Sequence, residues 1–370
     1  MLTVVSVLAL FASAAMAADG PPGITTPVVL PAYNPDAPAC QVPPGLTRTL
    51  GYVQENDRDF LEGANQGLAA AAHDRGLAYQ RVLADSDAQK AASEIQAFRA
   101  AKTGAIIATS SNPELVSHDI QQAIWSGEFV GTIVPPPATL ILNAPQYETG
   151  KVLADAAIDY IKTKLGGKAT VVLLTQDSMQ FLAPRFEAMR RELAQLPGVS
   201  IVADIAPNPV SKEGGFATMN TILSATPNVD VVLGADSVVL GALQALREAH
   251  KDRPDQFLGG IDGEPEAVAE IKTGGGPYKA SIALSSAVFG YAMGQSAADW
   301  LDGKSVPQAM DALPIALSKD NLAQYEADQA NPAAVYADPA RRDTYIRRYG
   351  NICYDTRDQY LNFPWSSEAR

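Results

Sequence analysis

The feature that most constrains this fold is a regular alternation of short apolar runs with amphipathic segments, which begins at Thr47. The segments between most of the runs are about 12 to 20 residues long and have helical spacing. In residues 151–164, for example, Val152, Ala156 and Tyr160 share one face. Alternating strands and helices are typical of βαβ units, whose parallel strands are covered by helices. The expected strands are residues 48–53, 79–84, 104–108, 129–134, 169–175, 199–205, 229–234, 257–261 and 279–284.

Runs such as Ala105-Ile106-Ile107-Ala108 are apolar throughout, which predicts strands buried on both faces. This number of strands is too large for a single sheet in this chain. The alternation of apolar runs and amphipathic segments is interrupted at residues 135–137, which are all Pro. The pattern therefore predicts an α/β protein of two doubly wound parallel-sheet lobes, with residues 135–143 as a linker. The expected parts are residues 1–17 as a signal peptide, 18–47 as an irregular arm, 48–138 with about 286–313 as lobe 1, 139–285 as lobe 2 and 314–370 as a C-terminal extension.

The chain begins with an uncharged apolar run that is too short for a membrane span. Ala15-Met16-Ala17 follows it and has the pattern that signal peptidases cleave. We therefore expect cleavage near Ala17 and a periplasmic mature protein. Because no Lys or Arg precedes the run, an ordinary N-terminal hydrophobic strand is the alternative.

Two cysteines, Cys40 and Cys353, are present. In an oxidising compartment an even number of cysteines indicates a disulfide, here one that joins the arm to the C-terminal extension. Two buried free thiols are the alternative. Two cysteines are too few for a structural zinc site, and the three histidines lack ligand spacing, so no metal is expected.

The net charge of −13 argues against binding to nucleic acid, which requires clustered Lys and Arg. The chain has no Gly-x-Ser-x-Gly elbow, and Gly274-Gly275-Gly276 precedes a short strand and does not open a helix. We therefore expect neither an enzyme nor a cofactor.

In open parallel sheets, ligands bind beyond the carboxyl ends of the strands. Polar clusters follow several expected strands, at residues 54–60, 109–112, 176–181, 235–237 and 262–264. Any one of these clusters fits a helix cap, but together they converge on one rim. The rim is the predicted binding site.

Several segments, in order and spacing, resemble the type I periplasmic solute-binding proteins that serve ABC importers, the ribose-binding group. The resemblance covers roughly residues 47–303. The matching segments are Asp59-Phe60-Leu61-Glu62-Gly63-Ala64-Asn65-Gln66-Gly67, Asp85-Ser86-Asp87-Ala88-Gln89-Lys90, Gly234-Ala235-Asp236 and Gly259-Gly260-Ile261-Asp262-Gly263.

The resemblance implies two lobes joined by a hinge of three crossings, with the ligand trapped between them on closure. It implies that Phe60 stacks on a sugar ring and that Asp236 and Asp262 accept hydrogen bonds from hydroxyl groups. It also implies a monomer that captures a small solute, with a sugar or polyol favoured, and delivers it to a permease in the inner membrane. The expected ligand-binding residues are Asn56, Arg58, Asp59, Phe60, Ser110, Asp177, Phe181, Asp236 and Asp262.

The chain departs from this group at several anchor positions. Val134-Pro135-Pro136 stands where sugar binders have Asp-Arg or Asn-Arg, and Leu284 replaces a Gln. Ala183 occupies the place of the second-lobe arginine, with Arg185 two positions later. A less polar ligand, such as a nucleoside or an aromatic acid against Phe181, is therefore the alternative. A sensor that feeds a receptor kinase is the alternative output.

Overall fold

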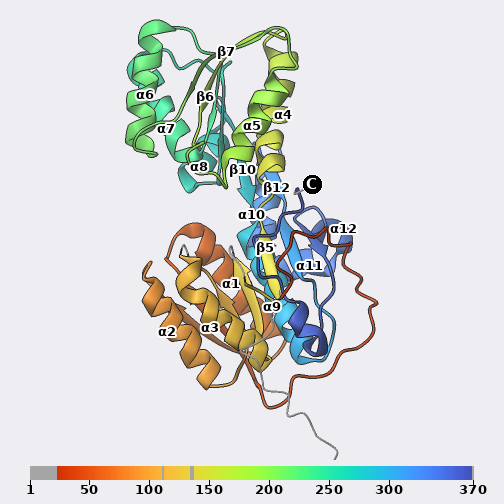
Figure 1. Ribbon diagram of the computed structural model, residues 1–370. Helices are drawn as coiled ribbons and strands as arrows, with labels where there is room; N and C mark the ends of the chain where they lie inside the picture. The colour runs from red at the N-terminus through yellow and green to blue at the C-terminus, as the bar shows by residue number, and fades with distance from the viewer. Residues whose placement is uncertain (1–22, 111, 134–136, 369–370) are drawn as a thin grey trace, which may run out of the picture.

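The computed structural model describes residues 23–110, 112–133 and 137–368, and these form two α/β lobes joined by a narrow waist (Figure 1). The fold class predicted from the sequence is confirmed. The predicted signal peptide lies outside the described residues. Among the residues that are described, no helix is long and apolar enough to cross a membrane.

Lobe 1 is built on a seven-stranded sheet with the order β13-β11-β5-β4-β3-β1-β2, in which only β13 is antiparallel to its neighbour. Helices α1 and α9 cover one face, and α2 and α3 cover the other. The elements of lobe 1 are β1 (Thr47–Gln54), α1 (Asp59–Asp74), β2 (Ala78–Leu83), α2 (Ala88–Ala100), β3 (Thr103–Ala108), α3 (Pro113–Ser126), β4 (Phe129–Ile133), β5 (Leu140–Asn143), α9 (Ser286–Leu301), β11 (Ala309–Ala312), α11 (Pro332–Ala337), α12 (Pro339–Arg342), β13 (Ile346–Tyr349) and the 3-10 helix η1 (Tyr354–Gln359).

Lobe 2 is built on a six-stranded sheet with the order β12-β10-β9-β8-β6-β7, in which β12 is the antiparallel strand. Helix α10 (Leu322–Ala330) follows β12 and lies at the waist. The elements of lobe 2 are α4 (Gln146–Lys164), β6 (Ala169–Leu174), α5 (Ala183–Leu193), β7 (Val199–Ile205), α6 (Lys212–Ala225), β8 (Val231–Gly234), α7 (Asp236–Glu248), β9 (Phe257–Ile261), α8 (Pro265–Thr273), β10 (Tyr278–Leu284) and β12 (Pro314–Leu317).

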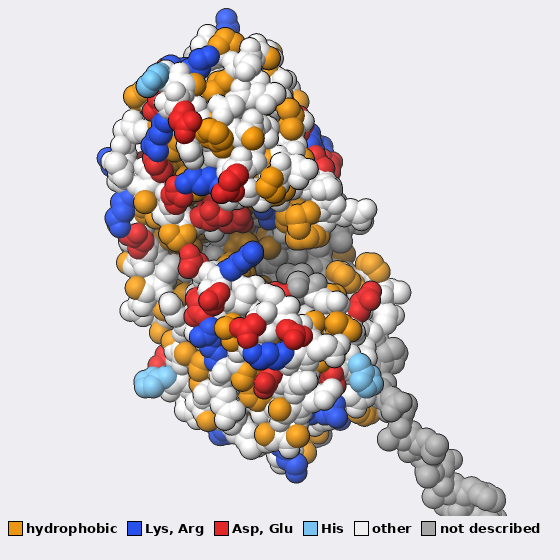
Figure 2. All heavy atoms as spheres, turned by 90° about the vertical axis from the view of Figure 1, so that its left-hand side faces the viewer, with side chains coloured by type: hydrophobic (Ala, Val, Ile, Leu, Met, Phe, Trp, Pro, Cys, Tyr) orange, Lys and Arg blue, Asp and Glu red, His pale blue; other side chains and the backbone are white. Residues whose placement is uncertain are grey.

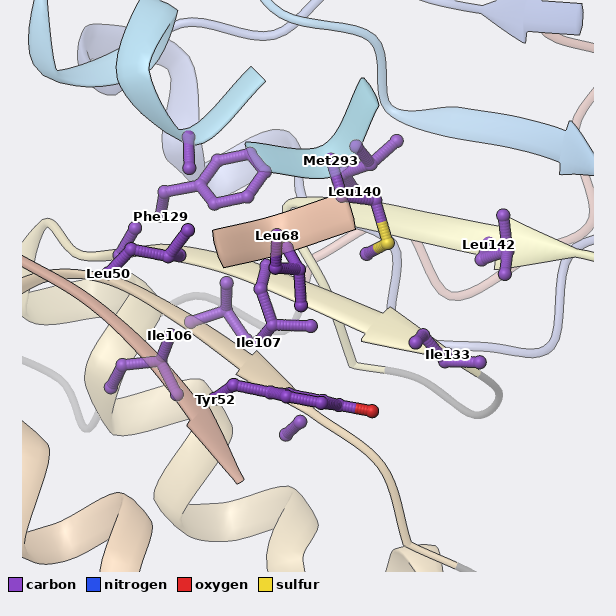
Figure 3. Close-up of a cluster of buried hydrophobic side chains, with 14 of the residues drawn as sticks. Leu50, Tyr52, Leu68, Ile106, Ile107, Phe129, Ile133, Leu140, Leu142 and Met293 are labelled. Carbon is purple, nitrogen blue, oxygen red and sulfur yellow. The ribbon is translucent and has the colours of Figure 1, made fainter. Parts of the chain in front are cut away.

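The core of lobe 1 shows why its strands read as continuous apolar runs. Every residue of β3 and β4 is buried, because helices cover both faces of the sheet. Figure 3 shows side chains from several strands gathered with Leu68 of α1 and Met293 of α9 in one cluster. This packing makes the lobe a rigid support for the loops at its strand ends.

The expected linker at residues 138–143 is in fact partly a strand. β5 pairs in parallel with β4 and with β11, so it belongs to the sheet of lobe 1. The chain therefore leaves lobe 1 after Asn143, one short strand later than the expected boundary at residue 138. The Pro-rich break hid this strand, because β5 is only four residues long and its second partner, β11, is remote in the sequence.

Helices α1 and α9 approach each other closely. A Cβ on Gly67 would lie 2.1 Å from the carbonyl oxygen of Ala287, and one on Gly290 would lie 2.4 Å from that of Ala64. These glycines allow the two helix backbones to touch. The contact places the start of α1, which carries Phe60, against Phe289 of α9, with ring centroids 5.3 Å apart.

The chain crosses between the lobes four times, one more than the three-crossing hinge implied by the resemblance. The crossings follow β5, β10, β11 and β12. The fourth crossing is α10, whose Leu322 belongs to the core of lobe 2, while Oε1 of Gln329 accepts a hydrogen bond from the backbone of Ala287 in lobe 1 at 3.2 Å. Residues 314–370 are therefore more than a tail on one lobe, because they add a strand to each sheet.

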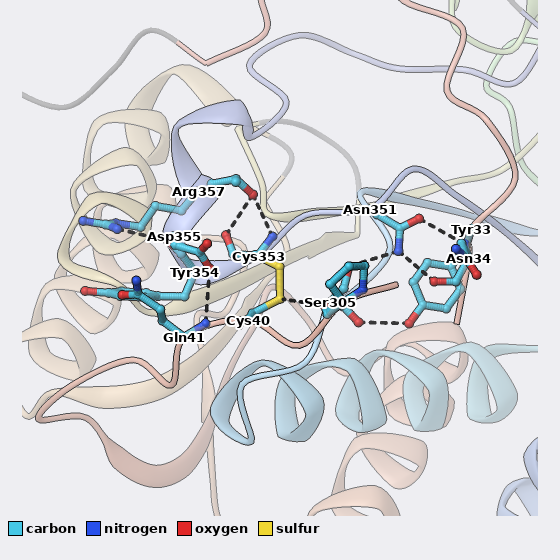
Figure 4. Close-up of a disulfide and its surroundings, with 12 residues drawn as sticks. Tyr33, Asn34, Cys40, Gln41, Ser305, Asn351, Cys353, Tyr354, Asp355 and Arg357 are labelled. Carbon is cyan, nitrogen blue, oxygen red and sulfur yellow. Dashed lines mark hydrogen bonds between the residues drawn. A yellow bond between two sulfur atoms is a disulfide. The ribbon is translucent and has the colours of Figure 1, made fainter. Parts of the chain in front are cut away.

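The arm and the C-terminal extension are tied together on lobe 1. The arm residue Ala32 forms an antiparallel bridge with Tyr349 of β13. The predicted disulfide between Cys40 and Cys353 is confirmed, with Cα atoms 5.5 Å apart (Figure 4). It closes a loop that spans most of the chain and so restricts the unfolded state strongly.

Candidate ligand-binding cleft

The direction of the strands places a cleft between the lobes. β5 is parallel to β4, and the chain passes from its carboxyl end into lobe 2, so the carboxyl ends of the parallel strands of lobe 1 face lobe 2. β10 is parallel to β9 and leads back from its carboxyl end into lobe 1, so the carboxyl ends in lobe 2 face lobe 1. Figure 2 shows the surface hollowed between the lobes, with acidic side chains gathered on the rim of lobe 2 and a basic side chain in the mouth.

Asp262 stands at the carboxyl end of β9 on a tight turn. Its φ of 118° lies in the region that side chains rarely adopt, and Gly263 follows with a φ of 70°. The backbone NH of Asp262 donates to the carbonyl of Ile282 at 2.8 Å, and that of Gly263 donates to Oγ of Ser281 at 3.0 Å. These bonds hold a conformation that costs on the order of 1–3 kcal/mol, which is typical of functional sites.

The Asp262 residue is exposed to water and is nevertheless surrounded by protein. Burial among those protein atoms raises the pKa of its carboxyl, and the Arg185 guanidinium acts in the opposite direction. Exposure together with desolvation is what a side chain on the wall of a concave site experiences. Asp262 is therefore a candidate acceptor for a ligand in the cleft.

Asp236, at the start of α7, lies beneath this wall. It is fully buried, and its carboxylate accepts hydrogen bonds from Tyr278 at 2.7 Å, from Ser281 at 2.6 Å and from the backbone of Glu264 at 2.8 Å. Burial raises the pKa of Asp236 to about 7, although these three donors favour the charged form. In this structure Asp236 is thus a support for the turn that carries Asp262.

Arg185 was not in the expected set, but it is the buried cation behind the second-lobe wall. Its Nε and Nη2 atoms donate to Oε1 of Gln146 at 2.8 and 2.6 Å. Burial lowers the pKa of the guanidinium, and Asp262 opposes that shift. The signal in the sequence was its place in the helix that follows a cleft-facing strand, two positions from the expected arginine.

Lobe 1 contributes a cation from the opposite side. The loop after β1 is an Asx turn in which Oδ1 of Asn56 accepts from the backbone of Arg58 at 3.2 Å. Burial, Asp262 and Glu266 raise the pKa of Glu264, while the Arg58 guanidinium lowers it. Arg58 of lobe 1 therefore faces an acidic edge of lobe 2 across the cleft. Asp59, the first residue of α1, is exposed beside this loop.

Phe60 supplies an aromatic surface on the same wall. Its side chain is 36% exposed although its ring packs against Phe289. A ring that is supported from behind and open in front can stack on the apolar face of a ligand.

The remaining predicted residues lie in other local settings. Oγ of Ser110 accepts from the backbone of Asn112 at 3.2 Å in the loop after β3. Asp177 pairs with Arg190, whose Nη1 atom lies 3.1 Å from Oδ1, and the same guanidinium bonds to Asp204 of β7. Phe181 is 63% exposed in the loop after β6. The structure thus brings Arg58 and Asp262 to one cleft and leaves Asp177 engaged with the outer edge of lobe 2.

Comparison with known proteins agrees with this geometry. A family model described as the periplasmic binding protein domain matches residues 52–305. The chain belongs to this periplasmic binding protein family. Members of the family bind substrates for transport and are not enzymes, and membership implies a periplasmic location.

Alignments with individual relatives cover much of this chain and of each relative. The ribose import binding protein of Bacillus subtilis is 26% identical over 71% of this chain and 85% of its own. The D-apiose import binding protein of Actinobacillus succinogenes is 26% identical over 60% and 71%. A solved periplasmic ribose ABC transporter protein from Conexibacter woesei has a TM-score of 0.66 at 18% identity, covers 76% of this chain and 95% of its own, and shares the fold.

Proposed function

We propose that this periplasmic binding protein captures a sugar or polyol in the cleft and delivers it to an ABC permease. The observation that carries the proposal is Asp262, an exposed carboxylate held on a strained turn at the cleft-facing end of β9. Ionised acceptors make the strong hydrogen bonds that hydroxyl groups need. Relatives described as binding proteins for ribose and D-apiose support the same ligand class.

The two lobes divide the recognition. Phe60 of lobe 1 stacks on the apolar face of the sugar ring. Asp262 of lobe 2, with Arg185 behind it, accepts hydrogen bonds from the hydroxyl groups. Arg58 and Glu264 approach each other as the lobes close, which favours the closed state electrostatically. Because each lobe holds half of the ligand's partners, the ligand stabilises closure.

A less polar ligand is the second candidate. Phe181 and Met179 are 63% and 42% exposed in the loop after β6. Such side chains suit the body of a nucleoside or an aromatic acid. This candidate keeps Asp262 and Phe60 as contacts and replaces only the class of solute.

The test is a thermal-shift and calorimetric screen of the oxidised protein against pentoses, hexoses, polyols, nucleosides and aromatic acids. A ligand at 100 times its dissociation constant adds about 2.7 kcal/mol of stability. Asp262→Asn and Phe60→Ala should each weaken the best ligand at least about tenfold. Glu266→Gln is the control, since Glu266 is exposed on the same rim and pairs with Lys212.

Binding that is unchanged in both Asp262→Asn and Phe60→Ala would refute the site. Hits among nucleosides or aromatic acids alone would favour the second candidate. The ligand should be recovered unmodified by NMR after prolonged incubation, because the proposed role involves no turnover. Mass spectrometry of the mature protein should show that it begins at Ala18. The protein should run as a monomer with and without ligand. Co-purification with a sensor kinase in place of a permease would favour a signalling role.

A further inference from the structure

A second hollow lies between the N-terminal arm and the C-terminal extension, away from the cleft. α9 begins at the hinge and runs about 24 Å, and the hollow lies beside its far end. Its lining combines the arm, the end of α9, α11, α12 and β13. The charged and aromatic residues that line it are Tyr33, Asp299, Lys304, Tyr336, Arg342 and Arg348.

Two guanidinium groups in this hollow rest on tyrosine rings. The guanidinium of Arg348 lies 4.9 Å from the ring centroid of Tyr33, and that of Arg342 lies 5.7 Å from that of Tyr336. Cation–π contacts orient a guanidinium but leave its N–H groups free to donate. Within the described part of the chain, Arg348 has no carboxylate partner, and Arg342 uses its Nε atom for Asp343.

A hydroxyl donor completes the set. Within the described residues the Tyr336 hydroxyl has no hydrogen bond. Burial raises the pKa of Tyr336, so the group remains protonated at neutral pH. Unpaired donors in a hollow favour binding of an acceptor, because a desolvated donor without a hydrogen-bond partner costs about 1–3 kcal/mol of free energy.

The charge in the hollow is positive although the chain carries a net charge of −13. Asp299, its single carboxylate among the lining residues, accepts from Arg75 at 2.8 Å and from Lys304 at 3.1 Å. That carboxylate is therefore already compensated. Arg348, which has no carboxylate partner among the described residues, remains for a ligand, and Arg342 keeps its Nη donors beside the pair with Asp343.

The hollow is held open by contacts around the arm. The Tyr33 hydroxyl donates to the carbonyl of Ser305 at 2.9 Å, and Asn34 and Asn351 exchange hydrogen bonds of 3.0 and 2.9 Å. Figure 4 shows this cluster beside the disulfide of Cys40 and Cys353. A site fixed in this way loses little entropy on binding.

We propose that the hollow between the arm and the extension binds a small organic oxyanion, a carboxylate or phosphate group on a flat body. The anionic group accepts from Arg348, Arg342 and the Tyr336 hydroxyl. The flat body lies beside the rings of Tyr33 and Tyr336. This site is independent of the solute in the cleft, and it requires the covalent tie between the two chain ends.

The test uses 4-fluorobenzoate and 4-fluorophenyl phosphate as probes in fluorine NMR titrations of the full mature chain, with 4-fluorobenzyl alcohol as the neutral analogue. Arg348→Gln should weaken the better anion at least about tenfold. Tyr336→Phe keeps the ring and should weaken it severalfold, which guards against misfolding of the first variant. Arg347→Gln is the matched control, because Arg347 is the adjacent arginine on β13 and faces Tyr349, Glu148 and Asp311 instead.

The preference between the two anions identifies the group that the site takes, and either preference supports the proposal. Equal binding of the neutral alcohol, or equal loss in Arg347→Gln and Arg348→Gln, would overturn it. Failure of both anions to bind at about 10 mM, weaker than any useful site, would also overturn it. A Cys40→Ser/Cys353→Ser variant should lose anion binding while it keeps the cleft ligand, so failure of this proposal is distinct from failure of the transport function.

Discussion

The two lobes share one architecture but differ in what surrounds it. The six-stranded sheet of lobe 2 ends in the edge strand β7, where Val202 and Ile205 are 41% and 44% exposed. The edge of lobe 1 is covered instead: β13 extends its sheet, the arm bridges to β13, and the disulfide fastens the arm to the segment that follows. Most of the described residues outside the family match at residues 52–305 thus pack on lobe 1.

Lobe 1 is thus the lobe that the two chain ends tie down more extensively. It also provides a measurement, because all three tryptophans, Trp125, Trp300 and Trp365, lie in lobe 1 or in the extension packed on it. Tryptophan fluorescence therefore follows lobe 1 alone. Far-ultraviolet circular dichroism follows both lobes.

The largest expected effect comes from opening the disulfide. Cys40→Ser/Cys353→Ser removes a constraint between residues 313 positions apart, which the chain-entropy model values at about 6 kcal/mol. In guanidinium titrations the midpoint of the tryptophan fluorescence transition, which reports lobe 1, should move to a lower denaturant concentration. The part of the circular dichroism change that comes from lobe 2 should keep its midpoint. Equal shifts of both signals would show that the lobes unfold as one unit and would break the comparison.

The helix contacts offer a matched pair of variants. A Cβ at Gly67 would lie 2.1 Å from the Ala287 carbonyl in lobe 1, and one at Gly241 would lie 2.0 Å from the Lys212 carbonyl in lobe 2. Gly67→Ala and Gly241→Ala should each cost about 3 kcal/mol, because the helices must separate. Gly67→Ala should lower the midpoint of the fluorescence transition, which reports lobe 1. Gly241→Ala should change only the dichroism transition. Any other combination of signal and variant would contradict independent unfolding of the lobes.

Each lobe also holds one buried carboxyl whose pKa is raised to about 7, and the two differ in their partners. Burial raises the pKa of Glu128 in lobe 1 and of Asp236 in lobe 2. A raised folded-state pKa means that the folded state binds the proton more tightly, so each lobe loses stability as the pH rises from about 4 to about 7. Shifts of this size correspond to about 3 to 4 kcal/mol.

Substitution should separate the two carboxyls. Oε2 of Glu128 is buried without a hydrogen bond among the described residues, whereas Asp236 accepts three. At pH 8 Glu128→Gln should therefore stabilise lobe 1 by about 2 kcal/mol, while Asp236→Asn gains less because it loses acceptors. Denaturation at pH 5 and pH 8 measures both, and an equal gain in the two variants would show that the partners of Asp236 contribute nothing.

The smallest effect concerns a link between the lobes. The carboxylate of Glu368 in the extension accepts from the backbone NH groups of Tyr147 and Glu148 at 3.0 and 2.7 Å, at the start of α4 in lobe 2. Glu368→Ala should cost about 1 kcal/mol, as the loss of a helix cap does. Small-angle scattering should show a wider range of openings, and Glu326→Ala, which removes an exposed pair with Lys272, is the control.

The sequence alone determined most of the strands, the α/β class and the disulfide, and it predicted that a ligand binds at the carboxyl ends of the strands. Local pattern carried these features, because a strand buried on both faces must be apolar throughout, and a parallel strand must end in a loop at the shared edge. The strand expected at residues 199–205, for example, is β7 at the same residues. Even the candidate Asp262 followed from its place after β9.

Only the tertiary structure decided which polar side chains face the cleft. Asp236 and Asp262 both follow strands of lobe 2, yet one is fully buried under three donors and the other is exposed on a turn with positive φ. The fourth crossing, the strand β5 and the role of Arg185 were likewise set by partners far along the chain. Local sequence reports a residue's own preferences, whereas burial and pairing depend on segments that meet only after the chain has folded.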